Sequence, residues 1–196
     1  MNQSTQHKNQ YREVLLQKRK DLSVVFQREA SYKIVNHIFD SACFRSAKSI
    51  ALYHAVRGEA DPAALLTTAM TKQFYLPVLS LDADNSLFFS PINRDTQYKK
   101  NKFSIPEPLC SESSLVRASD LDLIVMPLLG FDRQGNRLGM GGGYYDRSLS
   151  FKKTHVSKPL LMGFAYQWQE LESISVDPWD ISLDSLVTEN GLIKYK

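Results

Sequence analysis

The chain has 196 residues, a length at which one domain is the default, and its 43% hydrophobic content is enough to close a core. The net charge of only +3, from 24 basic and 21 acidic residues, argues against a nucleic-acid-binding protein. Cys43 and Cys110 form neither a zinc pattern nor a disulfide framework, and the longest apolar run, Leu123 to Phe131, is about half the length of a membrane span. We therefore expect a single cytoplasmic domain over residues 1–196 that does not bind membranes.

The first third of the chain predicts two helices, a strand and a third helix. Apolar residues recur at helical spacing over Tyr11–Lys20 and Phe26–Phe39, where no glycine or proline interrupts them. Ser49–Val56 has the length and composition of a buried strand. Asp61 followed by Pro62 is typical of a helix start, which predicts a helix over Pro62–Met70.

The rest of the chain is rich in predicted strands. Gln73–Leu79 and Leu87–Ile92 are expected to be strands, with Asp82, Asp84 and Asn85 forming a turn between them. Residues 93–120 are polar and interrupted by prolines, which predicts a loop. Further strands are expected at Leu121–Met126, Lys158–Tyr166, Leu183–Val187 and Leu192–Tyr195. Alternating strands and helices favour an α/β fold of three layers, α/β/α, around a mostly parallel or mixed sheet.

Glycines gather at positions 139, 141, 142 and 143, between a buried strand and a predicted helix that runs through Tyr144, Asp146 and Leu149. Backbone amides of glycines can approach an anion closely, which indicates a phosphate site. The pattern matches neither the dinucleotide fingerprint nor a Walker A loop, so a plain glycine-rich loop stays open as an alternative. Arg137 and Asp146 favour a triphosphate, because they add a cation and a carboxylate suited to Mg²⁺.

The run MPLLGFDRQGNRLGMGGGYYDR resembles the signature of the 5-formyltetrahydrofolate cyclo-ligase family. Other parts of the chain agree with the family in order and spacing, so the resemblance covers nearly the whole sequence: Lys8, Arg12, Arg19, Leu22-Ser23, Tyr53, Glu59, Ile105–Pro108, Asp180, Asp184 and Thr188-Glu189. There are two departures. Gly142 stands where some relatives carry a lysine, and Phe103 replaces a tryptophan of some members.

The resemblance implies an ATP- and Mg²⁺-dependent conversion of 5-formyltetrahydrofolate into 5,10-methenyltetrahydrofolate, with release of ADP and phosphate. It also implies a fold like that of ribose-phosphate isomerase and coenzyme A transferase proteins. The expected partners are these small molecules, with no nucleic acid and no membrane, and the expected state is a monomer.

The resemblance also assigns roles to residues of this sequence. Arg137 and Tyr145 are expected to be catalytic, and Asp146 and Asp184 to bind Mg²⁺. ATP is expected to contact Lys8, Arg12, Arg137, Leu138, Gly139, Met140, Gly141, Gly142, Gly143, Tyr144 and Tyr145. The folate is expected to contact His54, Glu59, Met140, Gly141, Gly142, Gly143 and Tyr144.

Each role has an alternative that the sequence leaves open. Lys8, Arg12 and Arg19 fall within roughly 40° on a helix, which also fits a solvated basic face. Asp146 could have the purely structural role of complementing a helix dipole, and Asp184 could be an ordinary surface residue. For the whole chain, the rival interpretations are a sugar-phosphate isomerase, which needs a general base and no ATP, and a noncatalytic nucleotide- or RNA-binding protein.

Overall fold

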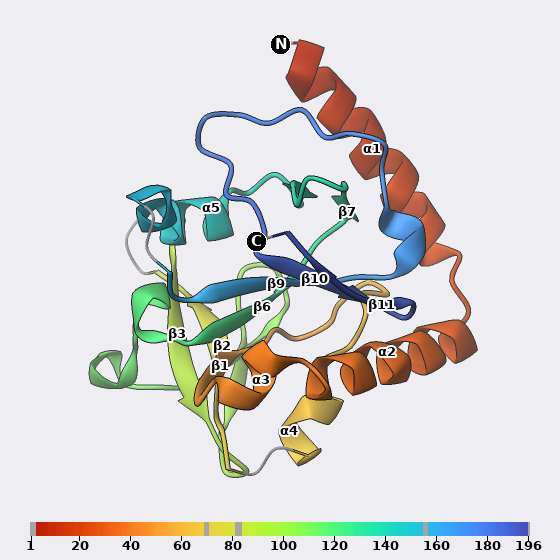
Figure 1. Cartoon of the computed structure of the whole chain (residues 1–196). Coiled ribbons are helices and arrows are strands. Elements are labelled where there is room, and N and C mark those ends of the chain that lie inside the picture. Colours follow the sequence, from red (N-terminus) through yellow and green to blue (C-terminus); the bar gives the residue numbers. More distant parts are fainter. Residues whose placement is uncertain (1–2, 69–70, 81–83, 155–156, 196) are drawn as a thin grey trace.

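A seven-stranded sheet forms the centre of the computed structural model, which describes residues 3–68, 71–80, 84–154 and 157–195 (Figure 1). The strand order is β11-β10-β9-β6-β1-β2-β3. The five inner strands are parallel, whereas the edge strands β3 and β11 run antiparallel to their neighbours. In chain order the strands are β1 Ser49–Ala51, β2 Gln73–Leu79, β3 Leu87–Ile92, β6 Leu123–Pro127, β9 Leu160–Phe164, β10 Ser185–Thr188 and β11 Gly191–Lys194. The prediction of a mostly parallel α/β sheet is confirmed.

The central strands are apolar on both faces because both faces are covered. Leu123, Ile124, Val125 and Met126 of β6 are all fully buried, so this strand shows no alternation of polar and apolar residues. Such continuous apolar runs are typical of parallel strands between two layers of helices.

One face of the sheet is covered by α2 (Val24–Phe39), α3 (Ala42–Ser46) and α4 (Ala64–Thr68), which lie together below the sheet in Figure 1. Ser23 caps α2 by accepting a hydrogen bond from the amide of Phe26 at 3.1 Å. Ile34 and Ile38 of α2 are fully buried and belong to the same apolar cluster as residues of β1 and β6.

The opposite face has a thinner cover of short helices. These are α5 (Tyr144–Ser148) and the 3₁₀ turns η2 (Ala118–Asp120) and η3 (Ser150–Thr154). Leu149 packs in one cluster with Ile124 and Leu161 of the sheet. Two further 3₁₀ turns, Glu112–Ser114 and Gln167–Gln169, lie in connecting segments.

The first helix, α1 (Gln3–Lys20), packs outside these layers. Its buried Leu15 shares a cluster with Leu129, Leu138 and Ile174, beside the small hairpin of β7 (Gly130–Phe131) and β8 (Arg137–Leu138). Figure 1 shows the segment between β9 and β10 running alongside α1. Within the described ranges, no helix combines the length and apolar character of a membrane span.

The expectations for the second and third strands agree with β2 and β3, and the later strands differ from prediction by a few residues at their ends. The first strand is shorter than expected. It ends at Ala51, and the following loop folds back on itself through a hydrogen bond from the Tyr53 hydroxyl to the Ala60 carbonyl. The helix expected over Pro62–Met70 is found at Ala64–Thr68, and residues 69–70 lie outside the described ranges, as does Asp82 of the predicted turn.

The prediction of an irregular loop over residues 93–120 is wrong in part. The segment contains a hairpin of β4 (Tyr98–Lys100) and β5 (Pro106–Pro108). Its turn is closed by the side chain of Asn101, which accepts hydrogen bonds from the amides of Phe103 and Ile105. The backbone closes the turn as well, through hydrogen bonds from the Ser104 amide to the Asn101 carbonyl at 2.9 Å and from the Asn101 amide to the Ile105 carbonyl at 3.0 Å. Composition alone hides this hairpin, because its strands have only three residues each.

Gly163 in the middle of β9 provides a test of the packing. A Cβ atom added there would lie 2.6 Å from Leu186, 2.7 Å from Leu183 and 2.8 Å from Leu128. We expect Gly163→Ala to lower the free energy of unfolding by about 1–3 kcal/mol through overpacking, measured by urea denaturation. Gly139→Ala is the control, since a Cβ atom there would contact nothing within 4 Å. Equal stability of the two variants would contradict this packing.

Candidate functional site

The glycine-rich segment, residues 139–143, links β8 to α5 and is mostly exposed. Gly141 and Gly143 have φ angles of +91° and +67°, which residues with a Cβ atom rarely adopt. Within the described part of the chain, none of the five amides of this segment donates a hydrogen bond to the protein. Five consecutive donors are therefore available to a ligand.

Two arginines hold the carbonyl oxygens of the same segment. Arg12 from α1 donates through Nε to the carbonyl of Gly139 at 2.9 Å, and Arg147 from α5 donates to the carbonyl of Gly142. A Cβ atom on Gly141 would lie 3.4 Å from the Arg12 guanidinium, so the cation lies directly against the glycines. Two positive charges thus flank the exposed amides. Arg147 was not among the predicted site residues, although it follows the glycines by one helical turn.

Lys8 was expected at the nucleotide, and the structure places it in a buried ion-pair cluster. Its Nζ lies 2.6 Å from Oδ2 of Asp177 and 2.8 Å from Oδ2 of Asp180. Burial lowers the pKa of Lys8, but the bonds to the two aspartates outweigh burial and raise that pKa overall. This ammonium therefore joins α1 to the segment that precedes β10.

Arg137 and Asp146 form a second clamp on that segment. The guanidinium donates to Oδ1 of Asp146 at 2.8 Å and also to the carbonyl of Ile181, whose amide in turn donates to Oδ1 of Asp146 at 3.1 Å. The Arg137 side chain is only 7% exposed. These contacts fix the orientation of Asp146 at the start of α5. Arg137 thus lies beside Asp146, the carboxylate with which the sequence analysis had grouped it.

The two predicted Mg²⁺ ligands differ in their surroundings. In the described residues no contact occupies Oδ2 of Asp146, whose side chain is 23% exposed. Oδ2 of Asp184 accepts from the Leu161 amide at 2.9 Å and lies 3.5 Å from Nζ of Lys152. No cluster of three or more His, Cys, Asp or Glu side chains occurs in the described ranges. Mg²⁺ is compatible with this arrangement, because it is usually held by one or two carboxylates together with substrate phosphates and water.

Glu59 is largely buried, with 11% of its side chain exposed, and it is paired, although the sequence suggested no structural role for it. Its Oε1 lies 3.3 Å from a terminal nitrogen of Arg19, and its Oε2 accepts from the Val56 amide at 3.1 Å. Burial raises the pKa of Glu59, while the positive charge of Arg19 opposes that rise. Arg19 is therefore no part of an exposed basic edge.

Tyr144 and Tyr145 follow the glycines and lie near several of the charged side chains of this region. Burial raises the pKa of Tyr145, with a further rise from the negative charge of Glu59 and an opposing effect of Arg137. The phenol therefore stays protonated and lies near both groups. The Tyr144 ring is flanked by Lys102 at 5.6 Å and Arg147 at 6.0 Å, and its hydroxyl donates to Asn85 at 3.1 Å.

The β4–β5 hairpin reaches both ends of this region through aromatic contacts. The Tyr98 ring lies 5.3 Å from the His54 ring, and the Phe103 ring lies 5.7 Å from the Tyr144 ring. His54 is partly buried, and burial lowers its pKa. The sequence did not predict the hairpin, although the two aromatic residues that make these contacts stand at the ends of the run YKKNKF over residues 98–103.

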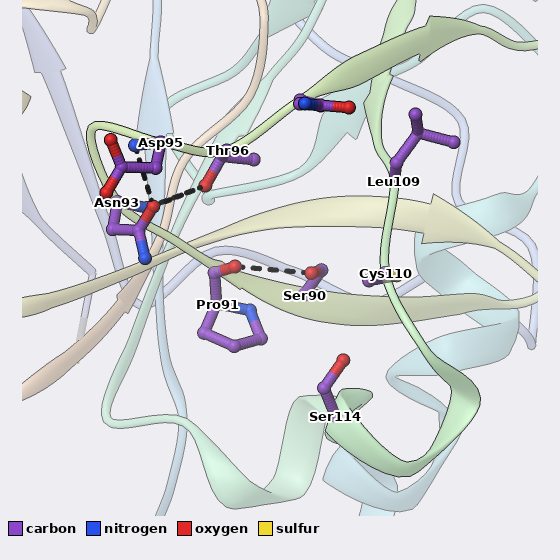
Figure 2. Close-up of a pocket in the computed structure, with 9 residues that line it drawn as sticks. Ser90, Pro91, Asn93, Asp95, Thr96, Leu109, Cys110 and Ser114 are labelled. Atoms are coloured by element: carbon purple, nitrogen blue, oxygen red, sulfur yellow. Dashed lines mark hydrogen bonds between the residues drawn. The ribbon is translucent and has the colours of Figure 1, made fainter.

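A separate pocket lies at the end of β3, against residues 109–114 (Figure 2). Its polar groups bond largely to one another: Oδ1 of Asn93 accepts from the Asp95 amide and from the Thr96 hydroxyl. None of the predicted site residues lines this pocket, so the glycine-rich region remains the candidate site.

Comparison with known proteins points to one family over nearly the whole chain. The family model described as the 5-formyltetrahydrofolate cyclo-ligase family matches residues 4–189. The 5-formyltetrahydrofolate cyclo-ligase of Haemophilus influenzae is 36% identical over 92% of this chain and 96% of its own length. That of Escherichia coli is 30% identical over 93% of this chain and 100% of its own.

Solved structures give the same result. The 5,10-methenyltetrahydrofolate synthetase of Aquifex aeolicus superposes with a TM-score of 0.82 at 33% identity, over 96% of this chain and 93% of that one. The 5,10-methenyltetrahydrofolate synthetase of Mycoplasma pneumoniae gives a TM-score of 0.70 at 25% identity, over 93% of this chain and 98% of that one.

The Lys8 cluster can be tested by Asp180→Asn, since Asp180 accepts from both Lys8 and the Asp177 amide. We expect a loss of about 1 kcal/mol, which lowers the Tm by roughly 2–4 °C in a thermal scan. Arg133→Met is the control, because it removes an ion pair to Glu170 whose arginine is 84% exposed. That variant should change stability by less than about 0.5 kcal/mol. A larger effect of Arg133→Met would contradict the assignment.

Proposed function

This chain belongs to the 5-formyltetrahydrofolate cyclo-ligase family, and from that premise we propose how its glycine-rich site works. It is an ATP-dependent enzyme that converts 5-formyltetrahydrofolate into 5,10-methenyltetrahydrofolate, with ADP and phosphate as the other products. The predicted family resemblance is confirmed, and with it the choice of an ATP-dependent ligase over a sugar-phosphate isomerase or a noncatalytic binding protein.

The phosphates of ATP bind to the amides of residues 139–143 with Arg12 beside them. The observation that carries this proposal is the run of exposed amides without a protein partner in the described ranges, flanked by two arginines. Preorganised N–H donors and fixed cations stabilise the charge that spreads over a transferring phosphoryl group. Met140, Tyr144 and Tyr145 complete the walls of this nucleotide site, and Met140 is half-exposed. Leu138 is buried against Leu15, so it contributes through its backbone at the start of the segment.

Lys8 takes part in ATP binding from its present position only if a phosphate replaces one of its two aspartate partners. The bonds of 2.6 and 2.8 Å to Asp177 and Asp180 hold the ammonium until then. Both partners are acidic, so an anionic phosphate oxygen can take the place of a carboxylate oxygen as a charge-assisted acceptor of the ammonium.

The folate binds with its pterin at Glu59 and His54. A carboxylate can accept two hydrogen bonds from the amino group and ring N–H of a pterin, and the carboxylate of Glu59 is buried and fixed in orientation by two contacts. Tyr144 and the glycines 141–143 lie between the two substrates. Tyr145 has a phenol that stays protonated and is influenced by the charges of both Glu59 and Arg137, and it donates a hydrogen bond to the reacting groups.

The chemistry requires activation of a poor leaving group. The γ-phosphoryl group moves from ATP to the formyl oxygen, and ADP leaves; N10 of the folate then attacks the formyl carbon and loses its proton to water, and the oxygen departs as phosphate. These reaction steps need no nucleophilic side chain, only positioning of the substrates and stabilisation of charge. Arg137 contributes by holding Asp146 and the Ile181 backbone in place.

Asp146 and Asp184 are the residues that would hold Mg²⁺, which when bound would neutralise phosphate charge. Asp146 is the better suited, since its Oδ2 makes no contact among the described residues. Asp184 would bind the ion only with Lys152 displaced from its carboxylate. Arg137 and the Ile181 amide both donate to Oδ1 of Asp146 and so fix the orientation of its carboxylate.

The enzyme acts in the cytoplasm as a monomer of one domain, over residues 1–196, and without nucleic-acid or membrane partners. The small net charge of +3 and the two free cysteines, Cys43 and Cys110, support this proposal.

The overall reaction is tested by mixing the protein with Mg²⁺, ATP and 5-formyltetrahydrofolate and following the near-ultraviolet absorbance of the methenyl product. We expect product only when ATP and the folate are both present. Product formation without ATP, or none with it, would refute the assignment.

Asp146→Asn tests the metal proposal. The amide keeps the shape of the side chain but removes its negative charge, so we expect kcat to fall by about 100-fold and the Mg²⁺ requirement to rise. Asp184→Asn is measured in parallel: a second ligand would raise the Mg²⁺ requirement, whereas a purely structural residue would lower only the Tm. Unchanged turnover and unchanged Mg²⁺ dependence of Asp146→Asn would rule out its role.

Glu59→Gln tests the pterin contact. Because the amide replaces one acceptor by a donor, we expect the KM for 5-formyltetrahydrofolate to rise about 10-fold or more, with the KM for ATP nearly unchanged. Steady-state kinetics with each substrate varied in turn measure both values. Equal effects on the two KM values would argue against the contact.

A further inference from the structure

Arg19 is a deeply buried charged side chain that the reaction as proposed does not use. It is 1% exposed, at the end of α1, and its guanidinium contacts the carboxylate that we assign to the pterin. The loop that carries Glu59 packs tightly on it. A Cβ atom on Gly58, whose φ is +77°, would lie 3.0 Å from the Arg19 carbonyl and 3.3 Å from its Cγ.

The Arg19–Glu59 ion pair does not have the geometry of a strongly stabilising pair. A strong arginine–carboxylate pair has two parallel hydrogen bonds of about 2.8 Å. Here one nitrogen approaches one oxygen at 3.3 Å, and Nε of Arg19 has no partner among the described residues. Apolar residues of similar volume would often be at least as stable in such a place. The pair therefore calls for a role beyond packing.

The carboxylate of Glu59 keeps acceptor capacity for a ligand. An ionised carboxylate offers about four lone-pair directions, and Arg19 and the Val56 amide use one on each oxygen. Both remaining directions serve a ligand that presents two adjacent N–H groups. A protonated carboxyl would instead present a hydroxyl donor to those N–H groups, and the match would be lost.

The charges around Glu59 show which group keeps it ionised. Burial raises the pKa of Glu59, and the positive charge of Arg19 opposes this rise more strongly than that of Arg57 does. Arg57 lies on the same loop and is exposed to solvent. The other titratable groups that face it are the phenols of Tyr53 and Tyr145, which are neutral and whose own pKa values are raised by burial. An exposed charge is screened, so the guanidinium of Arg19 is the main electrostatic support of the carboxylate.

We propose that Arg19 is a positioning residue for folate recognition, which acts through Glu59 by holding its carboxylate ionised and correctly oriented for two N–H donors of the pterin. The inference rests on the proposed pterin contact of Glu59. It adds a second function to α1, whose Arg12 serves the phosphate end of the site two helical turns away.

The test compares Arg19→Met, Arg19→Lys and Arg57→Met by steady-state kinetics over a range of pH. For Arg19→Met we expect the KM for 5-formyltetrahydrofolate to rise about 10-fold, with the KM for ATP within about twofold of wild type. The acid limb of kcat/KM for the folate should move to higher pH, since a carboxyl with a higher pKa ionises later. Arg19→Lys should restore that limb toward wild type, and Arg57→Met should leave it in place.

A purely structural role predicts different results. It would lower the Tm of Arg19→Met and affect both substrates alike, with no movement of the acid limb, and this outcome would overturn the inference. If Arg19→Met does not fold, Arg19→Lys is compared in the wild-type and Glu59→Gln backgrounds. Arg19→Lys should raise the folate KM in the wild type but add nothing once Glu59 is Gln, whereas additive effects would overturn the inference.

Glu59→Gln separates this inference from the function that it rests on. A raised folate KM in Glu59→Gln with a normal one in Arg19→Met would overturn the role of Arg19 and leave the pterin contact standing. A normal folate KM in Glu59→Gln would remove the pterin contact and the inference with it, while product formation by the wild type would still establish the overall reaction.

Discussion

The carbonyl oxygens of the glycine-rich segment are bound by Arg12 and Arg147, while the amides of residues 139–143 make no hydrogen bond within the described chain. This separation of donors from acceptors is the constraint on which the site depends. A loop whose amides bonded to its own carbonyls would have nothing to offer an anion. Positive φ angles at Gly141 and Gly143 make the arrangement accessible to the backbone, and they explain why these positions are glycines.

Helix α1 connects the two ends of the site. Arg12 and Arg19 lie seven positions apart, which places them on the same side of the helix and roughly 10 Å apart along its axis. Arg12 lies against the glycines, and Arg19 lies under the loop of Glu59. The buried Leu15 between them anchors the helix to Leu129 and Leu138. This contact, together with the Lys8 ion pairs and the packing of Gly58 on Arg19, holds both cations next to the candidate site.

The sequence predicted the parts of this protein that depend on local pattern. Continuous apolar runs predicted the inner strands, which the structure confirms, and the glycines with Arg137 and Asp146 indicated the segment that stays the candidate site. It could not predict how cations and carboxylates pair, because helical spacing puts Lys8, Arg12 and Arg19 on one edge while their partners come from three distant segments. For the same reason Glu59 seemed to lack a structural role, and Asp184 gave no sign of its contact with Lys152.

The hairpin of β4 and β5 was missed for a related reason. Its strands have three residues each, and Asn101 closes the turn through both its side chain and its backbone. Neither feature has a periodicity that a sequence pattern could reveal. Yet the hairpin carries Tyr98 and Phe103, whose ring contacts connect it to His54 and Tyr144.

The most direct measurement is an NMR titration of the ¹⁵N-labelled protein with Mg²⁺ and a nonhydrolysable ATP analogue, which follows the amide signals of residues 139–143. The account predicts that these amides, and the Nε–H of Arg12, show the largest shifts and saturate together with nucleotide binding. Saturable binding that leaves these amide signals unmoved would contradict it.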